Sequence, residues 1–256
     1  MKAAIVVNPS SGGGKTARRW GQTRDEVKAR LGGIEEFVTQ APNDATRFAR
    51  QIAGNPEFEM LIAVGGDGTL NEIVNGLFDD QGKVLNPGLQ IGIMSAGRGC
   101  DFIKSVDIPD NYRDALGVIK THRLRKCDVG LAVFKDEFGR EQRRYFLNIA
   151  TAGLAGVVAS KVSHSPKWLP PELVYFGATA TSFLGHKGQK MKITADGKVV
   201  HDGPCLNVFV ANGAYSGAGM CWAPQSKVDD GLFDVVIVES LGKSRLFTSV
   251  HKLYDG

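Results

Sequence analysis

The sequence predicts a doubly wound α/β domain followed by a domain of antiparallel β-structure. Three observations predict this order. In the first half, short apolar runs alternate with amphipathic stretches, which is the pattern of strand–helix–strand units around a parallel sheet. Glycine-rich segments follow two of these apolar runs directly. Past residue 126, strand-like runs separated by Gly, Asp and Asn turns replace the alternation.

The first half supplies strands and helices in strict alternation. The expected strands are 3–7, 34–40 (at an edge of the sheet), 60–66 and 89–97, and the expected helices are 16–31, 43–53 and 69–78. An open sheet of this kind places its ligand at the carboxyl ends of the strands. The loops that follow the strands are therefore where we expect a binding site.

The second half predicts a β-sandwich. Its strand-like runs are 127–134, 140–153, 189–203, 205–215 and 232–240, and one helical stretch, 168–186, interrupts them. Asp196-Gly197 between alternating flanks is a strong hairpin signal. We take the basic stretch 121–126 as the junction, which gives domains 1–126 and 127–256. We expect the second domain to be incomplete at its C-terminus.

The composition is that of an ordinary soluble protein. Of the 256 residues, 43% are apolar and 23% charged, and no apolar run approaches the ~20 residues of a membrane span. The four cysteines form no Cys-x-x-Cys pair, so we expect reduced thiols in a cytoplasmic protein. A net charge of +4 does not call for nucleic acid as a partner. The basic stretches 120–126 and 140–144 suit a solvated surface, an anionic substrate or a membrane surface.

The segment Asn8 to Thr16 reads NPSSGGGKT and follows the first apolar run directly. Its Gly-Lys-Thr ending is typical of a P-loop, whose backbone N–H groups wrap phosphates. A P-loop needs glycine six positions before Lys15, and this chain has Pro9 there, without an N–H and with a fixed φ. The segment alone leaves open a nucleotide site, a variant of one, or a turn.

The most informative stretch is AVGGDGTLNE, residues 63–72. Glycines after a buried strand let the backbone turn sharply and approach a ligand closely. The helix that follows offers free N–H groups and a positive dipole end, which suits phosphate. Thr69 and Glu72 also have the spacing of a capping box, an equally good interpretation of those two residues. A capping box does not explain the block Gly-Gly-Asp-Gly.

NPSSGGGK, VGGDGTLNE, AGRGCDF, NGAYSGAGM and KVDDGLFDV occur in the order found in the diacylglycerol kinase catalytic domain family. The resemblance covers nearly the whole chain. The GGDGT block is shared with the NAD kinases, whereas its combination with the first and last blocks is typical of lipid kinases, including bacterial soluble ones. The resemblance implies a NAD-kinase-like α/β nucleotide domain and a β-sandwich domain, with ATP and lipid meeting between them.

The resemblance also implies a set of ATP-binding residues. They are Asn8, Lys15, Thr39, Gly65, Gly66, Asp67, Gly68, Thr69, Gly97 and Arg98. In the family's first glycine loop Pro9 is expected, Asn8 braces the turn with its amide, and Lys15 points its ammonium at phosphate. An exposed lysine at a helix start and a plain strand threonine are the alternative interpretations of Lys15 and Thr39. Asp67 would help to position Mg²⁺ at the phosphates.

One block departs from the family pattern. The family has P-L-G-T-x-N-D-F, and residues 95–102 read SAGRGCDF. Arg98 replaces the threonine and binds phosphate more strongly than a hydroxyl does. Cys100 replaces the asparagine and lacks the hydrogen bonds of an amide. Asp101 matches and is a candidate catalytic residue, with a helix cap as the alternative.

Asp128 matches an acidic position that the family has at its interdomain cleft, and it is the third catalytic candidate, after Asp67 and Asp101. Its alternative is an aspartate at a strand start that pairs with Arg125 or Lys126.

The block SKVDDGLFD resembles the family's structural Mg²⁺ site. There Asp230 would supply a carboxylate, and Lys227 and Leu232 backbone carbonyls, which suit Mg²⁺ or Ca²⁺. The alternative is a simple Asp-Gly turn.

These residues predict an ATP-dependent lipid kinase with a diacylglycerol-like acceptor and transient contact with a membrane surface. An enzyme of the NAD kinase type, or a catalytically weak nucleotide- or lipid-binding module, are the alternatives. The family's general base lies in a D-G-E motif near the C-terminus, and this chain stops at HKLYDG, before that segment is expected. We therefore expect binding of Mg·ATP and weak phosphorylation of lipid. The sequence leaves the oligomeric state open, a homodimer included.

Overall fold

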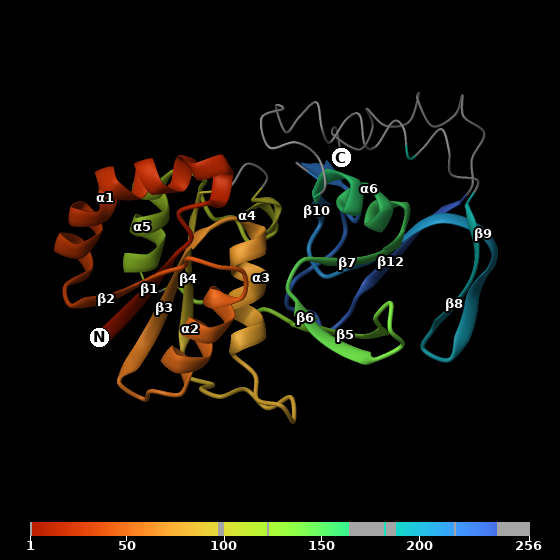
Figure 1. Cartoon of the computed structure of the whole chain (residues 1–256), viewed down its shortest axis with the longest axis horizontal. Helices are drawn as coiled ribbons and strands as arrows, with labels where there is room; N and C mark the ends of the chain where they lie inside the picture. The colour runs from red at the N-terminus through yellow and green to blue at the C-terminus, as the bar shows by residue number, and fades with distance from the viewer. Residues whose placement is uncertain are drawn as a thin grey trace. The chain divides into compact units, whose positions relative to one another are not determined.

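The computed structural model describes residues 2–96, 100–121, 123–163, 182, 188–217 and 219–239. The chain forms two compact units (Figure 1). The first contains Met1–Asn148, Asn212–Gly219 and Lys227–Leu232, and the second contains Ile149–Ala211, Met220–Ser226 and the chain from Phe233 onward. This partition differs from the expected boundary at residue 126, because a hairpin and two later segments pack on the α/β unit.

The first unit is built on a parallel sheet of order β2-β1-β3-β4. Its strands are β1 (Lys2–Val7), β2 (Ile34–Val38), β3 (Phe58–Gly65) and β4 (Gln90–Ser95). The helical elements are the 3₁₀ turn η1 (Ser11–Gly14), α1 (Lys15–Leu31), α2 (Asp44–Ala53), α3 (Asp67–Gly76), α4 (Asp101–Ser105) and α5 (Tyr112–Lys120). The doubly wound α/β fold is confirmed, with 34–38 at the expected edge.

Each face of this sheet has its own core because successive residues of a buried strand point to opposite faces. Ile5 and Val7 pack with Trp20 of α1 and Leu116 of α5. Ala4 and Val6 pack instead with side chains of α2 and α3, including Ile52. Figure 1 shows α1 and α5 on one side of the sheet, and α2 and α3 on the other. The sheet is thus covered by helices on both faces, and the carboxyl ends of its strands lie at one edge of these layers.

A two-stranded antiparallel hairpin completes the first unit. It pairs β5 (Gly130–Lys135) with β6 (Glu141–Phe146). The Asn75 side chain accepts from Tyr145 N and donates to Tyr145 O, both at 2.9 Å, and the Phe78 and Tyr145 rings stack. These contacts attach the hairpin to α3 and the segment after it.

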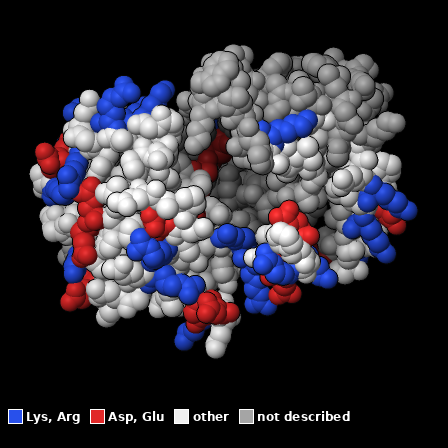
Figure 2. All heavy atoms as spheres, in the orientation of Figure 1, with Lys and Arg blue, Asp and Glu red and all other residues white. Residues whose placement is uncertain are grey.

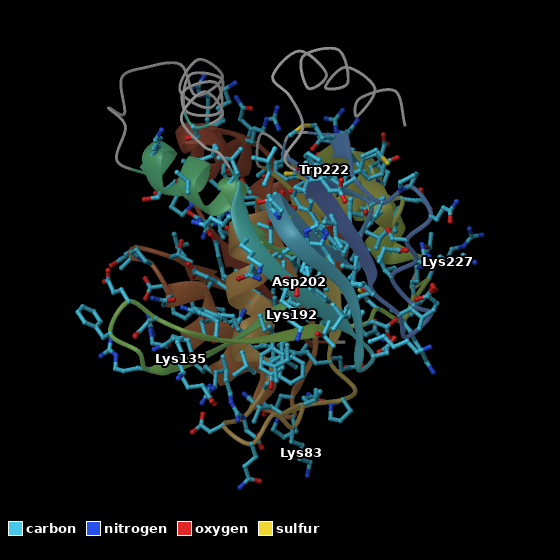
Figure 3. The ribbon with its side chains drawn as sticks, turned by 90° about the vertical axis from the view of Figure 1, so that its right-hand side faces the viewer. Lys83, Lys135, Lys192, Asp202, Trp222 and Lys227 are labelled. Atoms are coloured by element: carbon cyan, nitrogen blue, oxygen red, sulfur yellow. The ribbon has the colours of Figure 1, made fainter. Side chains whose placement is uncertain are left out.

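The second unit is rich in antiparallel β-structure. Strands β7 (Ile149–Gly153), β8 (Gln189–Ala195) and β12 (Asp234–Glu239) all pair antiparallel with the long β9 (Lys198–Ala211). Helix α6 (Leu154–Ser163) and the short strand β11 (Met220–Cys221) also belong to this unit, whereas the short strand β10 (Tyr215–Ser216) belongs to the first unit. The hairpin turn is confirmed, because Asp196 and Gly197 have φ of 47° and 78°. Lys192 and Asp202 lie opposite each other in this hairpin (Figure 3).

One expected strand of the second half differs from the structure, and one expected helix lies largely outside the described residues. The single strand expected over 140–153 is two strands, β6 and β7. The chain turns between them at Asn148, whose carbonyl accepts from Asn212 N and Gly213 N. The helix expected over 168–186 lies outside the described residues except for Ser182. Within the described ranges, no helix has the length and apolar character needed to cross a membrane.

Candidate functional site

The loops after β1, β3 and β4 meet at the carboxyl end of the parallel sheet. Asn8 N donates to Val64 O, and Ala96 N donates to Gly65 O, each at 2.9 Å. These bonds extend the strand pairing into the loops. A Cβ built on Gly12, whose φ is 61°, would lie 2.5 Å from Ala96 O. Only glycine therefore allows the first loop to approach the loop after β4 so closely.

Asn8 joins the first glycine loop to α3. Its Nδ2 donates to Thr69 Oγ1 at 2.9 Å, and its Oδ1 accepts from Ser10 N at 3.0 Å. One face of the amide thus closes the local turn while the other holds the helix that follows β3. The predicted bracing role of Asn8 is confirmed, and Pro9 sits within this turn.

Thr16 is a site residue that the sequence reasoning did not single out. It is fully buried in the first turn of α1. Its Oγ1 lies 2.9 Å from Ala96 O, 3.0 Å from Ser11 O and 2.6 Å from Ser11 Oγ. The hydroxyl therefore ties the glycine loop to the loop after β4. The position of Thr16 directly after Gly14-Lys15 could have marked it as a site residue. Its hydrogen-bond partner Ala96 could not be predicted, because it lies 80 residues away in the chain.

Thr16→Val should lower the free energy of unfolding by about 1–3 kcal/mol, because valine keeps the shape and leaves the buried Ala96 carbonyl without its donor. Urea unfolding followed by circular dichroism measures the change. Thr23→Val is the matched control on the same helix, since the Thr23 hydroxyl bonds Arg19 O at an exposed position. An equal loss in both variants would contradict a tie specific to Thr16.

The GGDGT stretch forms the turn into α3, which begins at Asp67 with Gly66 as the N-cap residue. The capping-box interpretation of Thr69 and Glu72 is therefore wrong, because the helix begins two residues before Thr69. Thr69 Oγ1 accepts from Asn8 instead, and Glu72 Oε2 accepts from Ala45 N at 3.3 Å. The exposed Gly68 has nothing within 4 Å of a built Cβ, so the helix start is open there.

Asp67 holds the start of α4. Its Oδ2 accepts from Asp101 N at 3.0 Å and its Oδ1 from Phe102 N at 3.2 Å. Burial raises the pKa of Asp67, against the opposing effect of these two N–H donors. The side chain of Asp101 is buried, and its Oδ1 lies 3.2 Å from Lys104 Nζ. The structure thus brings together two of the three catalytic candidates.

Cys100 is the N-cap residue of α4 and has φ 41° and ψ 52°. This left-handed conformation costs most residues roughly 1–2 kcal/mol, whereas asparagine adopts it more readily. The backbone thus gives a physical reason for the asparagine of the family pattern. It also shows that Asp101 lies in the first turn of α4, one residue past the N-cap position, so the cap interpretation of Asp101 is wrong.

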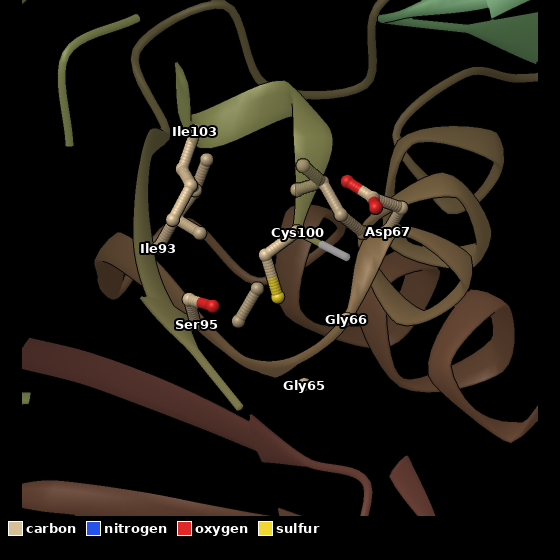
Figure 4. Close-up of a pocket in the computed structure, with 9 residues that line it drawn as sticks. Gly65, Gly66, Asp67, Ile93, Ser95, Cys100 and Ile103 are labelled. Carbon is tan, nitrogen blue, oxygen red and sulfur yellow. The ribbon is translucent and has the colours of Figure 1, made fainter. Parts of the chain in front are cut away.

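A small cavity opens beside Asp67 (Figure 4). Its volume is about 10 Å³, room for about one water molecule. The residues that line it are Ala63, Gly65, Gly66, Asp67, Leu70, Ile93, Ser95, Cys100 and Ile103. A nucleotide cannot enter so small a space, so the candidate phosphate site is the loop surface around it.

The remaining predicted nucleotide contacts lie at the same end of the sheet or outside the described residues. Lys15 is exposed at the start of α1, directly after the glycine loop. Thr39 follows β2 and its N donates to Val7 O at 2.9 Å. Gly97 and Arg98 lie outside the described residues. Contacts of Lys15 and Thr39 with a nucleotide stay predictions.

Asp128 contacts the candidate metal loop. Its N donates to Val228 O at 2.6 Å and its Oδ2 accepts from Gly231 N at 2.7 Å. Arg125 pairs with Asp229 at 3.1 Å, which lowers the pKa of Asp229. Arg125, which the alternative interpretation pairs with Asp128, therefore pairs with Asp229 instead. The described hydrogen bonds of Asp128 fit a role in shaping this loop.

The candidate metal loop itself is an Asp-Gly turn. Asp230 Oδ1 accepts from Leu232 N at 3.0 Å, and Gly231 has φ 75°. Among the residues that the structure describes, no three His, Cys, Asp or Glu side chains converge on a metal position. An ion bound here would therefore need backbone carbonyls as ligands in addition to the Asp230 carboxylate. The resemblance implies those of Lys227 and Leu232. The hard oxygen donors of the loop fit Mg²⁺.

Comparison with known proteins gives two family matches. Residues 2–132 match the diacylglycerol kinase catalytic domain, and residues 148–256 match the YegS C-terminal NAD kinase beta sandwich-like domain. A relative named diacylglycerol kinase from Staphylococcus aureus (strain MRSA252) is 29% identical over 247 residues, 96% of this chain and 73% of the relative. A second, from strain JH9, matches to the same extent.

Solved structures show the same likeness. A putative diacylglycerol kinase from Bacillus anthracis str. Sterne superimposes with a TM-score of 0.70 at 25% identity, covering 99% of this chain and 78% of that one. Another structure described in the same words has a TM-score of 0.65 at 26% identity with the same coverage. The order of an α/β unit and an antiparallel β-rich unit is therefore shared with these proteins.

Proposed function

The chain belongs to the diacylglycerol kinase catalytic domain family, and we propose that it transfers the γ-phosphoryl group of ATP to the hydroxyl of a lipid. The names of the relatives support a lipid kinase over an enzyme of the NAD kinase type. The observation that carries the proposal is the meeting of the glycine loops at the carboxyl end of the sheet. Asn8, Thr16 and Thr69 hold them there.

The residues of the site suit a nucleoside triphosphate. Glycine loops present backbone N–H groups, and the start of α3 adds the positive end of its dipole. The ammonium of Lys15 follows the first loop within reach of a ligand on that surface. In such a site, phosphate charge is neutralised by fixed cations and N–H donors that need no rearrangement during transfer.

The carboxylates of Asp67 and Asp101, which lie at the starts of α3 and α4, supply hard oxygen ligands that fit a Mg²⁺ ion. Carboxylates alone would repel phosphates, and a divalent cation held by these side chains would supply the positive charge that offsets this repulsion. Each oxygen of Asp67 accepts one N–H and keeps a second lone pair. We propose that these side chains hold the ion and that Asp128 keeps the neighbouring loop in place.

A phosphotransfer assay tests the function. The chain is incubated with radiolabelled ATP, Mg²⁺ and separate acceptors: diacylglycerol, sphingosine, ceramide, undecaprenol and NAD. We expect label in a lipid, with diacylglycerol the best acceptor. Labelled NADP would favour the NAD kinase alternative, and ATP binding without transfer to any acceptor would favour a binding module.

We propose a Mg²⁺ ion at the 227–232 loop as well, with a structural role. Asp230→Ala should lower the melting temperature by a few degrees and remove the stabilisation that added Mg²⁺ gives, because a ligand stabilises only the state that binds it. Thermal scans with and without Mg²⁺ measure both effects. Asp234→Asn, outside the loop, is the control. An unchanged Mg²⁺ response in Asp230→Ala would leave only the Asp-Gly turn.

A water-soluble nucleotide and a bilayer lipid must meet for this reaction. We therefore propose a cytoplasmic protein that contacts the membrane surface transiently.

A further inference from the structure

The β5–β6 hairpin exposes large apolar side chains on both of its faces. Leu131 and Val133 are 45% and 52% exposed, and Phe134, which points to the opposite face, is 47% exposed. Phe138 at the turn is 72% exposed. A two-stranded ribbon has no second layer to cover such residues. Their exposure calls for a partner outside the described residues of this unit.

Among the described residues, the contacts between the hairpin and the rest of the first unit lie at the root of the hairpin. Tyr145 is held by the Asn75 amide and by the Phe78 ring, and the buried Phe146 ring packs against Gly130. A Cβ on Gly130 would lie 2.2 Å from that ring. The root is thus closely packed while the exposed apolar residues lie beyond it, toward the turn.

The turn that carries Phe138 is preorganised. Asp136 Oδ1 accepts from Phe138 N and Arg140 N, both at 2.9 Å, and its Oδ2 accepts from Arg140 Nε at 2.9 Å. The Arg140 guanidinium lies 4.9 Å from the centre of the Phe138 ring. The turn therefore presents an aromatic ring beside a cation in a fixed geometry.

Basic residues outnumber acidic ones on the hairpin by four (Lys135, Arg140, Arg143 and Arg144) to three (Asp136, Glu137 and Glu141). Arg143 and Arg144 face Val133 and Ala132 across the ribbon, and Lys135 ends β5 (Figure 3). Arg143 pairs with Glu141, whereas no ion pair joins Lys135 or Arg144 to any described residue. In Figure 2 the hairpin, at the position it has in Figure 1, shows blue Lys and Arg atoms and red Asp and Glu atoms beside white surface. Exposed apolar groups flanked by cations are the combination that binds anionic bilayers.

We infer that the β5–β6 hairpin docks this protein on the surface of an anionic lipid bilayer. The inference rests on the proposed function, because an enzyme whose acceptor is a bilayer lipid must reside at the membrane surface. A second copy of the chain suits the hairpin less well. Lys135 and Arg144 lie on opposite faces of the ribbon, so a symmetric contact through either face would bring one of these cations from each copy together.

Vesicle sedimentation tests the inference. The chain is mixed, without ATP, with vesicles of phosphatidylcholine alone or with added phosphatidylglycerol. Val133→Ser/Phe138→Ser should lower the partition coefficient on the anionic vesicles by about tenfold or more. The control is Val199→Ser/Val200→Ser on β9, whose side chains are 53% and 50% exposed. The control should bind within about twofold of the parent.

A charge variant separates the two contributions. Lys135→Gln/Arg144→Gln should lower binding to anionic vesicles by about tenfold and leave the weak binding to phosphatidylcholine alone unchanged. Lys190→Gln/Lys198→Gln on the β8–β9 hairpin is its control. Circular dichroism checks that each variant is folded. If the serine double variant does not fold, the single Phe138→Ser at the exposed turn takes its place.

Equal vesicle binding by the hairpin variants and the parent would overturn the inference. So would light scattering that shows a dimer in the parent, a monomer in the serine variant, and unchanged vesicle binding. Turnover adds an independent reading: the serine variant should lose activity on diacylglycerol in bilayers and keep it on a short-chain diacylglycerol dispersed in water. Absence of all lipid phosphorylation would overturn the proposed function, and vesicle binding would still decide the role of the hairpin.

Discussion

Gly65→Ala should weaken ATP binding by at least about tenfold and lower the free energy of unfolding by about 2–4 kcal/mol. A Cβ at this position would lie 2.5 Å from Thr69 Oγ1 and 2.6 Å from Thr69 Cβ. Thr69 is buried and β-branched, so it cannot rotate away without cost. Its displacement would also break the hydrogen bond from Asn8 and release the first glycine loop.

Calorimetric titration with Mg·ATP and urea unfolding measure the two effects. Gly21→Ala is the control, because nothing lies within 4 Å of a Cβ built at Gly21 in α1. It should leave ATP affinity unchanged and stabilise the helix by about 0.5–1 kcal/mol. Normal ATP affinity in a folded Gly65→Ala protein would show that this turn does not form the phosphate site.

The α/β unit followed from the sequence because its signals are local and repeated. Each buried strand reads as an apolar run, and each helix carries one apolar stripe, so their order alone predicts a parallel sheet. The brace by Asn8 could also be predicted, since the glycine loop that needs it adjoins it in the chain. The Asp196-Gly197 turn is of the same kind, because both residues need positive φ.

What the sequence missed depends on partners distant in the chain. Thr16 bonds Ala96, and Asp128 bonds Gly231, 103 residues further on. No local pattern marks such pairs. The start of α3 was misplaced for a different reason: the Thr69–Glu72 spacing fits a cap, but the glycine turn had already ended at Gly66. Local patterns predict that a helix exists better than they predict its first residue.

The β5–β6 hairpin was correctly predicted to contain a strand, but the exposure of its apolar side chains was not predicted. The strand-like run expected over 127–134 contains four consecutive apolar residues, 131–134, a pattern consistent with a buried strand. In the structure, Leu131 and Val133 are exposed, because no described sheet or helix of the first unit covers them. Burial depends on what packs against a strand, and only the fold shows that.

Asp67→Asn should lower kcat/KM for lipid phosphorylation by about a hundredfold or more while the protein stays folded. The carboxylate accepts from Asp101 N and Phe102 N with its two oxygens. An asparagine accepts with one oxygen only, and its Nδ2–H groups would face the other N–H donor. The start of α4 would shift, and Asp101 with it, so both proposed Mg²⁺-binding side chains would be misplaced.

The pH dependence of kcat/KM provides a second test of the role of Asp67. Burial raises the pKa of Asp67 above the ordinary value of 3.8, so the folded protein takes up this proton at a higher pH than the unfolded chain does. As the pH falls through this pKa, protonation of the carboxylate should compete with the proposed Mg²⁺ ion for Asp67, and kcat/KM should fall. The residual activity of Asp67→Asn should lack this acid limb. Asp114→Asn, an exposed residue of α5, is the control and should keep both the rate and the limb. An Asp67→Asn protein with parental kcat/KM and an unchanged acid limb would exclude Asp67 from the catalytic site.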